Sequence, residues 1–460
     1  IGLELSTPQN PYSNLNSSLK AGSEDDGAGD NVYYGTGIFG AGNQSGHTYN
    51  YAFGFNAMYE LTSGDHNVAM GYQALKDITT GQYNVAIGNE ALANITTGSN
   101  NVAVGTSALT NVTTEQGLTA FGHAAAISNT TGSSIVAIGY AALNSNTTGD
   151  YNTALGYYAS RYNTTGDNNT SVGYHALYNN TTGSGSVGIG FEALYTATTE
   201  GSLTAIGYQA AKANTTGSGT VALGYQALTA NTTGDNNTAV GYQAIYTDTT
   251  GEQNTAIGYQ AMYDASDADY NTAIGFRSLY NLTDGYGNTA VGNSSMYSNT
   301  TGAENTAFGR SALYSNTSGN YNTAVGDNVM RNNTTGTQNV AIGRHALWTN
   351  TTGSYATASG YMALFSNTTG DSNTAFGYKA AYSNTTGTYN TAIGYESFYS
   401  NTTAAYNVAL GMQSLYANSS GAANTASGFR ALYSNTTGSY STAIGYEALY
   451  STTTQGSLTA

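Results

Sequence analysis

The chain has 460 residues, among them 59 Gly, 41 Tyr, 2 Pro and no Cys. Charged residues make up 8% of it and the formal net charge is −16, whereas an ordinary soluble domain has roughly 25% charged residues. A sparsely charged, acidic chain has no basic surface for nucleic acid or an anionic membrane, and no apolar stretch here is long enough to span a bilayer. The lack of Cys excludes disulfides, thiolate metal sites and a Cys nucleophile. Composition therefore disfavours an ordinary enzyme.

The first 36 residues are irregular and contain both prolines, Pro8 and Pro11. Oxygen ligands that could bind Ca²⁺ are clustered in this segment, at Glu24, Asp25, Asp26, Asp30 and Asn31. The cluster lacks the spacing of an EF-hand loop, so a solvated loop is the favoured alternative. Residues 1–36 are predicted to form an N-terminal adaptor, cap or linker.

Residues 37–460 are repetitive. An A-x-G core recurs every seventeen residues from Gly71 to Gly445 without insertion or deletion, and the same step reaches back to Gly54 and Gly37. A globular domain would need loops of varied length, whereas a period held over two dozen copies is typical of coils stacked into a solenoid. The sequence therefore predicts one continuous solenoid over residues 37–460.

One coil, numbered from position 0 at Asn271 to position 16, shows the predicted elements. Residues 271–275 alternate as a strand does, residues 278–280 indicate a second strand, and Gly275 and Phe276 form the corner. An N-T-T-G segment closes the coil, because its Gly supports positive φ and its Asn and Thr can bond nearby backbone. Frequent Gly, Asn and Thr argue against helix. The predicted fold is an all-β repeat solenoid, a parallel β-roll with two short strands per coil, forming a rod or fibre.

Both faces of the first strand are non-polar. Position 2 is small and usually Ala, and position 3 is large and apolar, as in Ala273 and Ile274. Successive side chains of a strand point to opposite faces, and one coil can cover only one face, so a second packed layer is implied. We therefore expect lateral association of chains, as a trimer or a bundled filament. The sequence leaves open which face is internal.

Position 0 is Asn in most coils, for example Asn254 and Asn322. Identical side chains stacked at the inter-strand spacing form a ladder in which the amides hydrogen-bond along the stack. A ladder of this kind is predicted at position 0.

Tyr residues form two columns, at positions 5 and 9, such as Tyr242 and Tyr246. One interpretation is a strip of rings that stacks on carbohydrate. The favoured interpretation is a ladder of rings that stabilises neighbouring coils.

The motif N-[TV]-A-[IVL]-G, as in residues 84–88 and 339–343, resembles the head repeats of trimeric autotransporter adhesins. The resemblance covers about residues 37–460 and implies the YadA-like head fold, a left-handed parallel β-roll of three chains. Similar repeats occur in phage tail fibres and secreted fibre proteins. This chain departs from the family in its seventeen-residue repeat and its many Tyr residues.

N-glycosylation sequons, N-x-[ST], fill the closing turns. Ordinary turn chemistry in a fibre without sugar would explain the same residues, but Asn followed by Thr or Ser two residues later dominates, which favours glycans along one edge of the stack. The predicted sites in the turn are Asn129, Asn146, Asn163, Asn180, Asn214, Asn231, Asn299, Asn316, Asn333, Asn350, Asn367, Asn384, Asn401, Asn418 and Asn435. Offset from them by one residue are Asn94, Asn111 and Asn281.

No catalytic or metal site is predicted. The five His residues share no coil position and no ligand spacing, and no His–carboxylate–Ser set recurs. We expect no enzyme activity and no cofactor, with covalent N-glycans as the only attached groups.

The two ends suggest a mode of assembly. Leu458, Thr459 and Ala460 occupy positions 0 to 2 of a coil, and joining them to Ile1 and Gly2 would restore A-I-G in frame. This predicts head-to-tail assembly by strand addition. The alternative is a fragment of a longer solenoid. Residue 1 is Ile rather than Met, which is consistent with removal of a leader.

These features predict an extracellular structural fibre protein, outside the cell or on the surface of a cell or virion, that assembles with itself into a long N-glycosylated filament. The alternative is a trimeric adhesin head or viral tail fibre that binds host-surface glycans. A distinct receptor-binding tip would favour the alternative and none is visible, whereas uniform coils favour the fibre.

Overall fold

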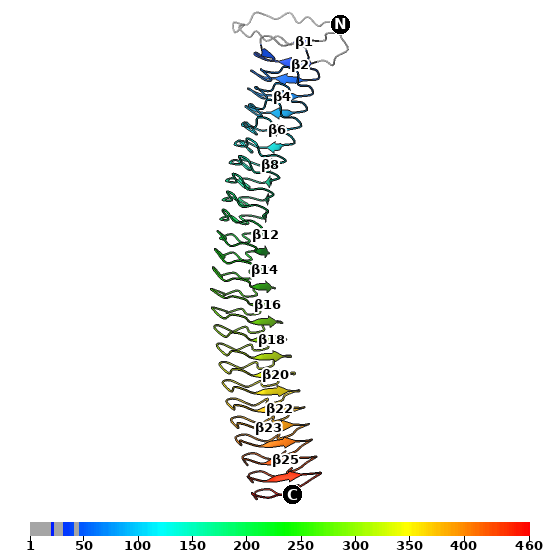
Figure 1. Ribbon diagram of the computed structural model, residues 1–460, viewed down its shortest axis with the longest axis vertical. Helices are drawn as coiled ribbons and strands as arrows, with labels where there is room; N and C mark the ends of the chain where they lie inside the picture. The colour runs from blue at the N-terminus through cyan, green and yellow to red at the C-terminus, as the bar shows by residue number, and fades with distance from the viewer. Residues whose placement is uncertain (1–19, 23–30, 41–45) are drawn as a thin grey trace, which may run out of the picture. The chain divides into compact units, whose positions relative to one another are not determined.

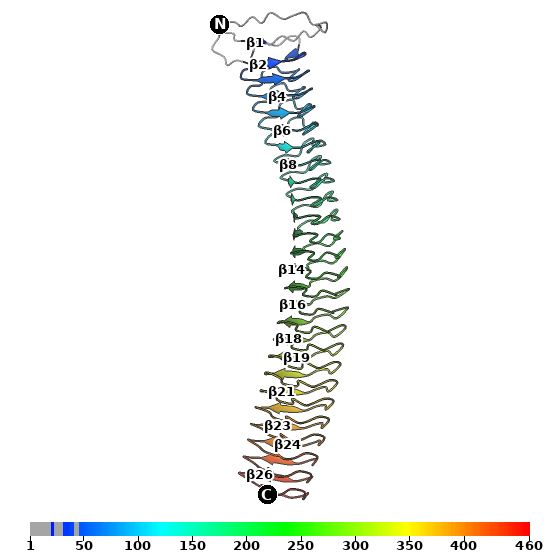
Figure 2. The same ribbon diagram turned by 180° about the vertical axis from the view of Figure 1, so that it is seen from behind.

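The computed structural model describes residues 20–22, 31–40 and 46–460. The chain divides into two compact units, Ile1–Gln209 and Ala210–Ala460. Each is a stack of coils in which the strands line one side and the closing turns the other (Figure 1), as the view from behind also shows (Figure 2). The described residues contain no α-helix.

In the first unit, β1 pairs with β2 antiparallel and all later strands are parallel and in register. Its strands are β1 Lys20–Gly22, β2 Asn31–Tyr34, β3 Tyr51–Phe53, β4 Val68–Met70, β5 Val85–Ile87, β6 Val102–Val104, β7 Thr119–Phe121, β8 Val136–Ile138, β9 Thr153–Leu155, β10 Thr170–Val172, β11 Val187–Ile189 and β12 Thr204–Ile206.

The second unit repeats the same parallel pairing, each residue lying opposite the one seventeen positions on. Its strands are β13 Val221–Leu223, β14 Thr238–Val240, β15 Thr255–Ile257, β16 Thr272–Ile274, β17 Thr289–Val291, β18 Thr306–Phe308, β19 Thr323–Val325, β20 Val340–Ile342, β21 Thr357–Ser359, β22 Thr374–Phe376, β23 Thr391–Ile393, β24 Val408–Leu410, β25 Thr425–Ser427 and β26 Thr442–Ile444. The predicted all-β solenoid of seventeen-residue coils is confirmed.

The small face of the strand is the internal one. In β16, Ala273 is fully buried, Thr272 is half-buried and Ile274 is exposed. Across the coil Ala273 is accompanied in the core by Leu279 of position 8, which is also fully buried. The core is thus a thin layer of Ala and Leu, and the bulky residue of position 3 faces outward.

The second predicted strand, residues 278–280, lies in a segment whose backbone hydrogen-bonds to both neighbouring coils. Arg277 N–H donates to Tyr259 O at 2.9 Å, and Leu279 N–H donates to Ser295 O at 3.0 Å. Arg277 and Leu279 have φ of 49° and 50°, a left-handed conformation that is uncommon outside glycine. The N–H of Arg277 thus bonds the preceding coil and the N–H of Leu279 bonds the following coil.

The glycine at the corner, position 4, lies against the glycine of the next coil. Gly275 has φ of 134°, and a Cβ added to it would lie 2.5 Å from Gly292 O. Gly275 N–H also donates to Ile257 O at 2.8 Å. The column of glycines is therefore required by both backbone conformation and close approach.

The first coil differs from the predicted register. Gly54 N–H donates to Tyr34 O at 2.9 Å, and β2 pairs with β3 with Tyr33 opposite Ala52. Gly35, and not Gly37, is therefore the equivalent of Gly54, so the prediction for Gly37 is wrong because this coil holds two extra residues. Parallel stacking begins at β2, before residue 37, while residues 1–19 and 23–30 of the predicted adaptor lie outside the described residues.

Candidate functional surface: an exposed apolar face beside buried asparagine ladders

The predicted ladder at position 0 is confirmed. Asn305 is fully buried, and its Nδ2 donates to Asn288 Oδ1 at 3.1 Å and to Gly319 O at 2.8 Å. Its Oδ1 accepts from both the backbone N–H and the Nδ2 of Asn322, at 2.9 and 3.1 Å. Each amide therefore joins three consecutive coils, and its polar atoms are satisfied inside the core.

A second asparagine ladder lies at position 11, in the closing turn. Asn316 is fully buried, and its Nδ2 donates to Asn299 Oδ1 at 2.8 Å and to Gly319 O at 2.9 Å. Gly319 O thus accepts from both ladders, because Asn305 Nδ2 also reaches it. The carbonyl of the turn glycine links the two columns in this coil.

Burial of the second ladder bears directly on the predicted glycans. The fifteen turn asparagines are at most 1% exposed and each donates an Nδ2 hydrogen bond to the carbonyl three residues on. Nδ2 is the atom to which an N-glycan is bonded, so the folded coil excludes sugar there. These residues are Asn129, Asn146, Asn163, Asn180, Asn214, Asn231, Asn299, Asn316, Asn333, Asn350, Asn367, Asn384, Asn401, Asn418 and Asn435.

The three offset sequons lie in a different environment. Asn111 is exposed, Asn94 and Asn281 are half-buried, and Asn94 Nδ2 donates to Asn111 Oδ1 at 3.2 Å. In these coils position 11 is filled instead by fully buried aliphatic residues, namely Ile95, Val112 and Leu282. Because aliphatic residues replace Asn at position 11 in these coils, the sequence itself indicated that position 11 faces the core.

These environments predict which sequons carry sugar. Of the eighteen predicted sites, we expect glycan in folded protein secreted from a eukaryotic host only at Asn94, Asn111 or Asn281, because the side chains of the other fifteen are buried. Glycopeptide mapping by mass spectrometry checks this. Substantial occupancy of Asn316 in folded material would contradict the arrangement of the second ladder.

The most extensive feature of the surface is apolar. We define the outer apolar face as the exposed residues of positions 3 and 5, on either side of the corner glycine. In the first unit these are Phe55, Met70, Tyr72, Ile87, Phe121, Tyr140, Leu155, Tyr157, Tyr174, Phe191, Ile206 and Tyr208. In the second they are Tyr225, Tyr242, Ile257, Tyr259, Ile274, Phe276, Phe308, Val325, Ile342, Tyr361, Phe376, Tyr378, Ile393, Tyr395, Met412, Ile444 and Tyr446.

The predicted aromatic ladders are confirmed. At position 5, Tyr242 and Tyr259 stack at 5.2 Å between ring centroids with 8° between planes. At position 9, Tyr263 and Tyr280 stack at 5.1 Å and 6°. The faces of the rings are turned toward neighbouring coils rather than outward, which disfavours a strip for stacking on sugars.

Charges interrupt position 5 in one place, where Arg310, Asp327 and Arg344 follow one another. Arg310 Nε lies 2.8 Å from Asp327 Oδ1, and Arg344 Nε lies 3.6 Å from Asp327 Oδ2. The guanidinium of Arg310 lowers the pKa of Asp327. These charges are paired along the stack.

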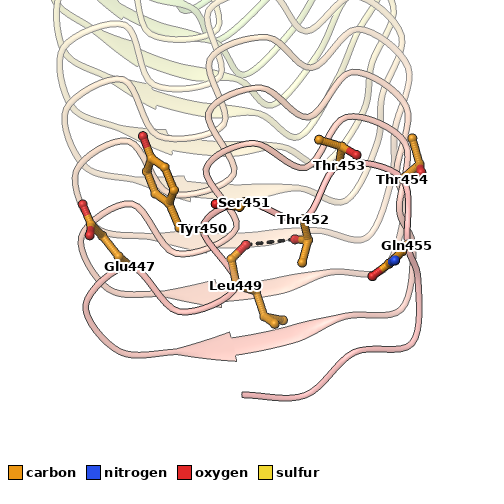
Figure 3. Close-up of a pocket in the computed structure, with 8 residues that line it drawn as sticks. All are labelled: Glu447, Leu449, Tyr450, Ser451, Thr452, Thr453, Thr454 and Gln455. Atoms are coloured by element: carbon orange, nitrogen blue, oxygen red, sulfur yellow. Dashed lines mark hydrogen bonds between the residues drawn. The ribbon is translucent and has the colours of Figure 1, made fainter.

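The titratable groups offer little for chemistry. Within residues 20–22, 31–40 and 46–460, no group of three or more His, Asp or Glu is placed to hold a metal ion. A hollow in the last coil is lined by Glu447, Leu449, Tyr450, Ser451, Thr452, Thr453, Thr454 and Gln455 (Figure 3). There Thr452 Oγ1 donates to Leu449 O at 2.9 Å, and Glu447 lies 4.0 Å from Arg430. Of the residues considered as Ca²⁺ ligands, Asn31 accepts at Oδ1 from Asn50 N–H at 2.9 Å, and Glu24, Asp25, Asp26 and Asp30 lie outside the described residues.

Of the predicted assembly residues, Ile1 and Gly2 also lie outside the described residues. Thr459 bridges to Thr442 in parallel, and Ala460 O accepts from Ile444 N–H at 2.8 Å. Leu458 and its two successors thus extend the stack by part of a coil. In the described part of the chain no helix is long and apolar enough to cross a membrane.

No protein-family model matches the chain, and no curated protein matches it.

Proposed function

We propose that the protein is a structural component of an extracellular fibre, in which copies of the chain associate side by side through the outer apolar face. The observation that carries the proposal is the exposure of large apolar residues in coil after coil, such as Ile257, Ile274 and Phe308, which are 39%, 37% and 43% exposed. Contiguous apolar surface of this kind is uncommon on a soluble monomer and marks a site of association.

The extent of the face fits a protein partner. In the second unit alone it includes eight residues of position 3 and nine of position 5, against about 20–30 residues on each side of a stable protein interface. In a second copy of the chain the exposed apolar residues recur at the same distance along the stack, once per coil. Apolar residues of one stack can therefore contact those of another over many coils.

Lateral association can be tested by charging the face. The triple variant Ile257→Asp, Ile274→Asp and Phe308→Asp should weaken self-association at least about tenfold, because each buried aliphatic or aromatic side chain contributes roughly 1.5–3 kcal/mol. Sedimentation velocity over a concentration series measures the effect and also gives the number of chains. Three chains would match the stoichiometry of the adhesin-like heads.

The matched control places the same charges on the edge formed by the turns. Thr301, Thr335 and Thr352 are exposed there, and their replacement by Asp should leave association unchanged. A wild-type chain that remains monomeric at high micromolar concentration would overturn the proposal, as would equal weakening by both triple variants.

A further inference from the structure

One coil of the second ladder carries a carboxyl in place of the amide. At position 11 the column runs through Asn214 and Asn231 to Asp248 and then Ala265. Asn231 donates from Nδ2 to Asn214 Oδ1 at 2.9 Å and to Gly234 O at 3.0 Å. Asp248 is 1% exposed, so its carboxyl lies in the core, where Asn214 and Asn231 of the two preceding coils carry amides.

The substitution leaves two buried oxygens without a hydrogen-bond donor. Asn231 Oδ1, which would accept from the next amide, has no partner, and neither has Asp248 Oδ2. Asn180 shows the same defect where Ala197 follows it, so the cause is the missing donor on the next coil. Asp248 Oδ1 does accept from Gly251 N–H at 2.9 Å.

We propose that Asp248 is a proton-binding site of the stack: its protonated carboxyl donates to Asn231 Oδ1, completes the ladder there, and holds this coil closed in mild acid. The carboxyl proton takes the place of the Nδ2 hydrogen that Asn231 donates to Asn214 Oδ1 in the preceding coil. Ionisation removes it and leaves an acceptor facing an acceptor, together with a buried charge.

The surrounding charges also favour the protonated form. Burial raises the pKa of Asp248 from 3.8 to about 6, with the charges of Asp267 and Asp269 adding to the rise and backbone N–H groups of Gly251 and Thr250 opposing it. Asp267 accepts from Thr250 Oγ1 at 2.6 Å and Asp269 accepts from Glu252 N–H at 2.7 Å. Asp235 and Asp264 lie on the flanking coils, and Glu252 lies on the same coil as Asp248.

The sign of the pH effect follows from linkage. Because the folded-state pKa lies above the unfolded value, stability is fully present in acid, falls as pH rises from about 4 to about 6, and is constant above that range. Local opening of this coil should therefore become on the order of tenfold more frequent between pH 4.5 and 7.5.

Hydrogen exchange with and without Asp248→Asn tests the proposal on the full chain. At pH 7.5 the amides of residues 245–252 should be at least about tenfold better protected in the variant, because an amide restores the donor. At pH 4.5 the two proteins should differ little. Asp264→Asn is the matched control, since Asp264 is exposed on the adjacent coil and its loss should leave the pH dependence of Asp248 intact.

Two results would overturn the proposal. One is an equal wild-type to variant ratio at both pH values, which would show that Asp248 is not protonated in the fold. The other is protection of the wild-type coil at pH 7.5 by millimolar calcium chloride to the level of the variant, which would identify the two oxygens as cation ligands instead. Neither result depends on whether chains associate laterally.

Discussion

Gly292→Ala should unfold several coils of the second unit. Gly292 has φ of 136°, and its added Cβ would lie 2.5 Å from Gly309 O and 2.7 Å from Gly309 C. The contacts are with backbone, which cannot withdraw without breaking the hydrogen bonds that hold the stack, such as Gly292 N–H to Ile274 O at 2.8 Å. Strained backbone conformation costs about 1–3 kcal/mol, and with the clash we expect a total of about 4 kcal/mol or more.

Gly287→Ala provides the matched control. Gly287 also has positive φ, 65°, but the nearest atom to an added Cβ is Glu304 Cγ at 3.5 Å. Tyr270 and Tyr321 adopt φ of 59° at the same coil position, so this backbone accepts a side chain, and the loss should be about 1 kcal/mol or less. Hydrogen exchange resolved by peptide measures both variants, because a stack of coils opens locally. Equal protection in the two variants would show that the corner column tolerates a Cβ.

Much of the coil could be predicted from residue types alone. The alternation of small and large residues predicted the first strand, although it left open that Ala273 and its equivalents face the core, and the repetition of Asn at position 0 predicted the ladder that contains Asn305. The aromatic ladders followed in the same way, because identical rings recur at a fixed step. These features could be predicted because one type of side chain recurs at the same position in most coils.

Other features had weaker signals. Nothing about Arg277 or Leu279 as residue types indicates positive φ, because that conformation is imposed by hydrogen bonds to coils on both sides. Asn316 belongs to a sequon, a motif that predicts a surface residue, but its side chain is buried in the core. The aliphatic residue Leu282 at the same coil position was the sequence signal that this position is internal. The extra residues of the first coil were missed because Gly37 happens to fit the step.

Asn305→Ala should be the second most damaging single change. It removes the acceptor of Asn322 N–H and of Asn322 Nδ2, and the donor to Asn288 Oδ1. Gly319 O keeps its bond from Asn316, so the main orphan is the buried N–H of Asn322. An unsatisfied buried group costs about 1–3 kcal/mol, and with the second lost amide bond we expect about 3–5 kcal/mol.

Asn305→Ser separates the hydrogen-bond loss from the loss of volume. In the chain itself Ser186 occupies position 0, where its Oγ accepts from Leu203 N–H at 3.3 Å, so a serine hydroxyl can replace part of the amide. The serine variant should therefore lose roughly half as much stability as the alanine variant, as measured by exchange of the Asn322 amide. If both variants lose the same amount, packing rather than the ladder dominates this column. A ladder that dominates would explain why an amide recurs where an aliphatic residue such as Leu118 also fits, because each amide stabilises the coil on either side of its own.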